Sequence, residues 1–238
     1  ERQFVAELRA LHSTYAQPAA ERQLLPAVDH GTVFFNVTAM ADAHDQFAAA
    51  LEAAVGGDGE VGAAISQHLL PARALHESYC LNLSQMTIVL ARAMATAPFA
   101  TFVQQASSAP TARQRPLQQL LLRPLARLFS YPSVLVQLRE LDERHADAPV
   151  LGAAVDALHQ IATLGAKCRT EAAATQRVIE LAMSTRAVTA TASAALQSLP
   201  REGRVLLRSA NVMLAVDAAA AASGTVRGGG MATARRPA

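Results

Sequence analysis

Residues 117–138 read LQQLLLRPLARLFSYPSVLVQL, a leucine-rich stretch with two prolines. Its leucines recur at about 3.6 residues, the period of an α-helix, and the pattern continues to Glu143. Pro124 and Pro132 fall inside the pattern, where each removes a backbone donor and bends the helix. We therefore predict a bent, leucine-rich helix at the centre of the protein, the most buried of the chain.

The composition of the whole chain agrees with a helical fold. Hydrophobic residues make up 51% of the 238 residues, while aromatic residues make up 4% and Trp is absent. Such a mixture, rich in Ala and Leu, favours helices over strands. The 21 basic and 19 acidic residues give a net charge of +2, which is not the basic footprint of a nucleic-acid-binding protein.

The chain carries two cysteines, Cys80 and Cys168, which are too few for a disulfide framework or a structural zinc site. They favour a reducing, cytosolic compartment. The sequence has no signal-peptide pattern and no uncharged apolar run of membrane-spanning length. We expect a soluble fragment that neither contacts a membrane directly nor holds a metal.

Apolar periodicity predicts further helices on both sides of the leucine-rich stretch. About six long helices joined by short connections predict an all-α fold, an elongated helical bundle. Residues 204–216 form the one short β-like run, and residues 217–238, mostly Ala, Gly and Arg, are predicted to be disordered. The predicted helices are 4–15, closed by Pro18; 28–55; 61–94, kinked at Pro71; 99–104; and 151–196.

Three patterns that resemble chemical sites are rejected. Residues 57–62, GDGEVG, fit the spacing of a dinucleotide fingerprint, but a helix precedes them and Asp58 and Glu60 would repel phosphate. His76 and Cys80 share a helix face, yet no second ligand pair exists, so we expect a half-exposed histidine beside a buried cysteine. No motif places a nucleophile beside its base, so a hydrolase is not supported.

The leucine-rich stretch also carries a resemblance to a known family. Arg123-Pro124, Arg127 and Tyr131-Pro132 stand in the register of the signature helix of Dbl homology domains, the catalytic modules of Rho guanine nucleotide exchange factors. Residues 1–18, residues 33–52 and residues 79–82 (YCLN) are similar to the other conserved regions of that family. The resemblance covers residues 1–175, with 176–198 as a continuation of the last helix or a linker.

The resemblance implies that the chain grips the switch segments of a Rho-family GTPase, prefers its nucleotide-free form, and acts by binding alone, without a cofactor or covalent chemistry. Glu1 matches the glutamate that binds switch I, and it is also an ordinary acid for a helix start. Leu122 matches a position that influences which GTPase is chosen, although it fits a core position equally well. Arg123 and Arg127 match nearby basic residues, and we expect Arg127 at a bundle edge, pairing with a carboxylate.

Three positions depart from the family pattern. Ala126, Ser130 and Ala166 stand where many members carry Gln, Lys and Asn. A weakened module that binds a GTPase or another partner as a scaffold is therefore the alternative function, and a helical protein unrelated to GTPases is a third. Either GTPase-binding function predicts that Glu1, Leu122, Ser130 and Ala166 share one exposed surface.

Residues 199–206, LPREGRVL, are similar to the approach to a pleckstrin homology domain, so 199–216 reads as its truncated start. No phosphoinositide binding is expected from so short a piece. The resemblance implies a cytoplasmic protein, recruited to membranes by regions outside this sequence.

Overall fold

The structure is a computed structural model that describes residues 1–57, 60–108, 115–141 and 148–185. All of them belong to the unit Glu1–Leu206, and they form helices and connections without a strand. The all-α helical fold is thereby confirmed. The predicted start of a pleckstrin homology domain at 199–216 and the predicted disordered tail at 217–238 lie outside the described residues.

The first helical run is longer than predicted. It comprises α1 (Arg2–Leu11), the π-helix η1 (His12–Ala16) and α2 (Gln17–Glu21), so the prediction that Pro18 closes it was wrong. In η1 the amide of Gln17 bonds the carbonyl of His12, five residues back. In this wider turn the preceding backbone carbonyls lie further from the proline ring, so they do not clash with it. Pro18 then occupies the first turn of α2, where its missing N–H donor is tolerated.

The same arrangement recurs in the third predicted helix. It comprises α5 (Val61–Ala64), the π-helix η2 (Ile65–Leu69) and α6 (Leu70–Met94), with Pro71 in the first turn of α6. Both prolines therefore follow a π turn directly. The short helix predicted at 99–104 is confirmed as α7 (Ala97–Ser107).

The helix predicted at 28–55 is two helices, α3 (Ala27–Val33) and α4 (Val37–Gly56). They are separated at Asn36, whose φ of 45° lies in the left-handed region that Asn tolerates better than most residues. The Asn36 side chain donates to the Leu75 carbonyl at 3.0 Å and to Ser78 Oγ at 3.0 Å, which fixes the break against α6.

The leucine-rich stretch is likewise divided, into α8 (Leu117–Leu121) and α9 (Arg123–Leu141), with the break at Leu122. Tyr79 donates its hydroxyl to the Leu121 carbonyl at 2.6 Å and so satisfies a group at the broken end. Pro132 lies inside α9 as predicted. The leucines that recur at the helical period are buried, namely Leu117, Leu121, Leu125, Leu128 and Leu135, whereas Leu138 is 37% exposed.

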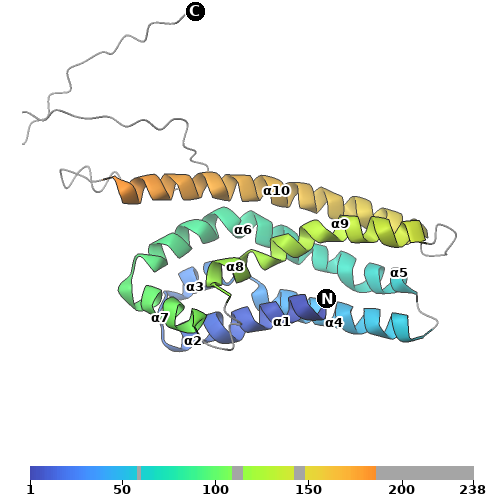
Figure 1. Cartoon of the computed structure of the whole chain (residues 1–238), viewed down its shortest axis with the longest axis horizontal. Helices are drawn as coiled ribbons and strands as arrows, with labels where there is room; N and C mark the ends of the chain where they lie inside the picture. The colour runs from blue at the N-terminus through green and yellow to red at the C-terminus, as the bar shows by residue number, and fades with distance from the viewer. Residues whose placement is uncertain (58–59, 109–114, 142–147, 186–238) are drawn as a thin grey trace, which may run out of the picture. The chain divides into compact units, whose positions relative to one another are not determined.

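The last helix, α10 (Ala148–Ser184), lies along both α6 and α9, and α1 packs against α4 (Figure 1). At Gly165 a Cβ atom would meet Cys80 Sγ at 3.2 Å and side-chain atoms of Leu128 and Phe129 at 3.3 Å, so glycine allows α10 to approach α6 and α9 closely. Two clusters of buried apolar residues fill the described bundle.

Within the described residues, no helix by itself has the length and apolarity to cross a bilayer. The run Val61–Met94 and the helix Ala97–Ser107, which meet at 100°, pass that test of length and composition only as a pair.

Candidate functional site

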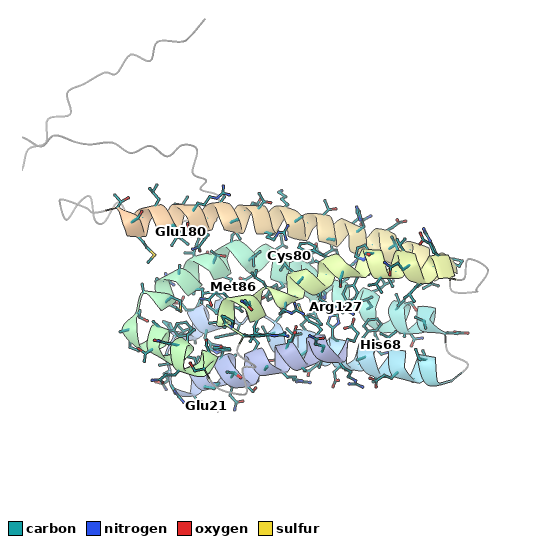
Figure 2. The ribbon with its side chains drawn as sticks, in the orientation of Figure 1. Glu21, His68, Cys80, Met86, Arg127 and Glu180 are labelled. Carbon is teal, nitrogen blue, oxygen red and sulfur yellow. The ribbon has the colours of Figure 1, made fainter. Side chains whose placement is uncertain are left out.

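The side chain of Glu1, at the start of α1, points into the bundle and is 4% exposed. Its Oε1 accepts hydrogen bonds from Arg127 Nε at 3.1 Å, from Arg127 Nη2, and from the Tyr131 hydroxyl at 2.9 Å. Arg127 lies between α9 and α1 (Figure 2). One carboxylate oxygen thus joins the first helix to the leucine-rich helix.

The second oxygen of Glu1, Oε2, makes no hydrogen bond. It lies 3.3 Å from His44 Nδ1, which is not aligned for a hydrogen bond. Burial would raise the pKa of the Glu1 carboxyl, but the interactions with His44 and Arg127 outweigh it and lower the pKa from 4.5 to about 2. Glu1 is therefore an ionised carboxylate with one unused acceptor.

The neighbours of Glu1 are held in turn by one another. The Arg127 guanidinium lies 4.7 Å from the centre of the Tyr131 ring, a cation–π arrangement. Burial and the charge of Glu1 raise the pKa of Tyr131 well above 10, so the hydroxyl stays protonated and donates to Glu1. The expectation that Arg127 pairs with a carboxylate is confirmed.

A second buried carboxylate, Glu7, lies further along α1. It pairs with Arg115 through Oε1 and with Arg123 through Oε2, and its side chain is 4% exposed. Gln3 Nε2 also donates to its Oε1 at 3.3 Å. Arg123, which the resemblance places at the GTPase-binding surface, is thus already engaged in an ion pair that ties the start of α9 to α1.

The predicted site residues do not all share one exposed surface. Leu122 is 48% exposed, Ala126 and Ala166 are exposed, and Ser130 is partly buried, with its hydroxyl donating to the Arg127 carbonyl at 2.7 Å. Glu1 contradicts the expectation, because Arg127 and Tyr131 enclose its carboxylate. The resemblance indicated Glu1, but nothing in the helical periodicity indicated the partners that bury it.

Leu122 also lines an apolar groove between α6, the α8–α9 break and α10. The groove has a volume of about 570 Å³, and Met86, Leu90 and Ala173 contribute to its walls, with Arg169 among the few polar side chains. The Arg169 guanidinium stacks 5.0 Å from the centre of the Phe129 ring. The break at Leu122 therefore places an exposed apolar side chain beside a hollow, so the core position considered for Leu122 was wrong.

Three further side chains, Tyr131, His44 and His76, join this site, although the sequence did not indicate a function for them. Tyr131 and His44 lie in family-like motifs without a predicted role, and His76 was predicted to be half-exposed. His76 is instead 1% exposed and contacts His44, because α4 and α6 face each other across this part of the bundle. The sequence signal for a buried His76 was its position as a polar ring on an otherwise apolar helix face.

Solved structures with the same fold have low sequence identity to this chain. PDZ-RhoGEF DH/PH domains complexed with GTP-γ-S-activated RhoA match with a TM-score of 0.65 and 19% identity, over 87% of this chain and 62% of that one. The linker-DH/PH domains of p115-RhoGEF match with a TM-score of 0.65 and 18% identity, over 85% and 64%. Human RhoA in complex with a DH/PH fragment of PDZRHOGEF gives 0.63 and 19%, over 84% and 60%.

The chain therefore spans about three fifths of these DH/PH structures. No curated protein matches it. The family model described as the RhoGEF domain matches residues 1–164, which is more than half of the chain. This match, together with the shared fold, shows that the chain belongs to the RhoGEF domain family.

Proposed function

We propose that this chain is a guanine nucleotide exchange factor that speeds GDP release from a Rho-family small GTPase. The observation that carries the proposal is the match of residues 1–164 to the RhoGEF domain, with an ionised Glu1 at the position of the switch-binding glutamate. The similar solved structures include complexes of DH/PH domains with RhoA, which supports a GTPase of that class as the partner.

Exchange of this kind needs no cofactor and no covalent step. A protein that binds the nucleotide-free GTPase more tightly than the loaded form must weaken nucleotide affinity by the same factor, because the two binding equilibria are linked. The chain therefore acts by differential binding, and its preferred partner is the nucleotide-free GTPase.

Glu1 Oε2 is the acceptor that we assign to the switch segment, since Oε1 already accepts three hydrogen bonds. Both oxygens are covered in the free chain. The GTPase must therefore displace part of this cover to reach Oε2. The contact then made is a charge-assisted hydrogen bond, the strong class of such bonds.

Leu122 supplies the apolar part of the proposed contact. Its 48% exposure beside the groove offers a surface that an apolar side chain of the GTPase can cover. The exposed Ala126 and Ala166 and the partly buried Ser130 offer little hydrogen-bonding capacity. A hydrogen bond that Gln, Lys or Asn would donate at these positions is worth about 1–2 kcal/mol, so we expect slow exchange without them.

A scaffold that binds a GTPase without releasing nucleotide is the second candidate. The buried state of Glu1 and the methyl groups of Ala126 and Ala166 favour it, because all three reduce the polar contacts available to a switch segment. The two candidates differ in one measurable quantity, the rate of nucleotide release.

The test is the release of a fluorescent GDP analogue from RhoA and from a panel of other Rho-family GTPases. The chain is compared with Glu1→Gln, which keeps the side-chain shape, and with Glu52→Gln, an exposed control paired with Arg2. Ala126→Gln combined with Ala166→Asn restores two amides at the positions that depart from the family. Binding to nucleotide-free GTPase is measured separately by calorimetry.

We expect faster GDP release that Glu1→Gln abolishes and Glu52→Gln preserves, with a further increase of about tenfold or more in the doubly restored variant. Tight binding to nucleotide-free GTPase without faster release would replace the proposal by the scaffold. If the chain neither binds nor accelerates any GTPase of the panel, both candidates are rejected.

A further inference from the structure

Two histidines from different helices meet behind Glu1. His44 of α4 and His76 of α6 are 0% and 1% exposed, and their Nε2 atoms lie 2.9 Å apart. Phe4 covers both rings, edge-on to His44 at 5.0 Å and stacked on His76 at 6.4 Å. Water is therefore kept from the pair, and each ring nitrogen depends on protein partners for its hydrogen bonds.

The hydrogen on His44 Nδ1 follows from the chemistry of its neighbours. Glu1 is ionised, so the Tyr131 hydroxyl donates its single hydrogen to Glu1 Oε1. The Tyr131 oxygen is then only an acceptor toward His44 Nδ1, 3.2 Å away. His44 Nδ1 must therefore carry a hydrogen, and this N–H also faces Glu1 Oε2 at 3.3 Å.

One hydrogen bond joins the two Nε2 atoms. Burial lowers the pKa of His76 to about 3, so His76 is neutral and its ring offers one N–H and one lone pair. Either ring can carry the hydrogen between the Nε2 atoms, and in both cases the bond holds the His44 ring in place.

We propose that His76 is a positioning residue for Glu1: through its hydrogen bond to His44 Nε2, it fixes the His44 ring with Nδ1–H toward Tyr131 and the Glu1 carboxylate. The inference rests on the proposed function for the role of Glu1 in exchange. Among the described residues no hydrogen bond or ion pair joins His76 to Glu1, and His76 reaches Glu1 through His44 and through its edge-on contact with the Tyr131 ring at 6.2 Å. The relay joins α6 to α4, and α4 to α1 and α9.

This arrangement gives the two oxygens of Glu1 different tasks. Donors from α9 hold Oε1, while the Nδ1–H group of His44 faces Oε2 at 3.3 Å without using it as a hydrogen-bond acceptor. If His76 did not bond Nε2, the His44 ring could turn and direct a lone pair toward Glu1. Repulsion would then move the carboxylate from the position that the switch segment needs.

The first experiment uses the complete chain without a GTPase. Nitrogen NMR of the imidazole rings should show a hydrogen on His44 Nδ1 and a scalar coupling across the hydrogen bond between His44 Nε2 and His76 Nε2. A His44 ring without a hydrogen on Nδ1, or the absence of this coupling, would overturn the proposal. This measurement requires no variant, so it tests the bond even if substitutions impair folding.

The second experiment compares His76→Phe, which keeps a ring without hydrogen-bonding atoms, with His76→Gln, whose amide can donate or accept. His68→Phe, the same change in the π turn η2, is the control. The titration of the Glu1 carboxyl, followed by carbon NMR, should move upward toward 4.5 in His76→Phe and stay near the wild-type midpoint in His76→Gln. An unchanged midpoint in a folded His76→Phe would reject the relay.

GDP release supplies the functional readout. We expect a loss of about tenfold or more in His76→Phe, recovery in His76→Gln, and no change in His68→Phe. If the wild-type chain does not accelerate release, the proposed exchange function fails, while the two NMR measurements still decide whether His76 positions Glu1. A rate unchanged in His76→Phe, in an active wild-type background, would reject the link between positioning and exchange.

Discussion

The Glu1 carboxylate should make the stability of the protein depend on pH in a defined window. Its pKa is about 2 in the folded chain, against 4.5 when unfolded. Because the folded value is the lower one, the stabilisation is complete above pH 4.5 and is lost as the pH falls toward 2. That difference corresponds to about 3 kcal/mol, and the 4% exposure of the side chain leaves little solvent to screen it.

The measurement is urea unfolding of the wild-type chain and of Glu1→Gln at a series of pH values. The difference between the two free energies of unfolding isolates Glu1 from the other carboxylates. Between pH 4 and pH 3 this difference should shrink by about 1.2 kcal/mol, slightly less than the full slope for one proton, because the unfolded carboxyl is not yet fully protonated at pH 4. Above pH 5.5 it should be constant.

Glu52→Gln provides the matched control. A hydrogen bond from Arg2 lowers the pKa of Glu52, but the pair is on the surface, so its effect should be small and should disappear in 0.5 M salt, which has a short screening length of about 4 Å. The Glu1 effect should survive the same salt. A Glu1→Gln difference that is flat from pH 6 to pH 3, or that salt removes, would refute the buried ion pair.

Two further substitutions test the packing and hydrogen bonding around the site. Gly165→Leu should destabilise the protein by about 1–3 kcal/mol in urea unfolding, because a side chain there meets α6 and α9. Gly152→Ala lies on the same helix with nothing within 4 Å, so it should stabilise the protein by up to about 1 kcal/mol. Stability changes of the same sign in the two variants would contradict the close approach at Gly165. Tyr79→Phe should lower the stability by about 1–3 kcal/mol in thermal unfolding, because it leaves the buried Leu121 carbonyl without its donor, and an unchanged stability would mean that this carbonyl has another partner.

Helical periodicity predicted the fold class and most helical segments, because apolar spacing reports directly which face of a helix is buried. It failed where tertiary hydrogen bonds decide the backbone. The break at Asn36 is fixed by bonds to α6, and the end of α8 by the hydroxyl of Tyr79. Neither partner is close in sequence, so no local pattern contains the information.

The site was predictable to a different extent. Resemblance to a family indicated Glu1, Leu122 and Arg127, and the ion pair expected for Arg127 is present. The burial of Glu1 was not predictable, because it depends on side chains of Tyr131 and His44 that reach it from other helices. Nor could spacing indicate that a histidine on α6 would face one on α4.

The π turn at His12–Ala16 also fixes the rotation of α1 about its axis relative to α2. Such a turn contains one more residue than an α turn, so deleting a single residue there would restore a regular α-helix. With Tyr15 and α2 held in place, the deletion would rotate α1 by about 100° and shift it by about 1.5 Å along its axis. Glu1 would then leave Arg127 while the leucine stripe lost its register. The chain length between Glu1 and Tyr15 is thus as constrained as the identities of the residues, and substitution should be tolerated there far better than insertion or deletion.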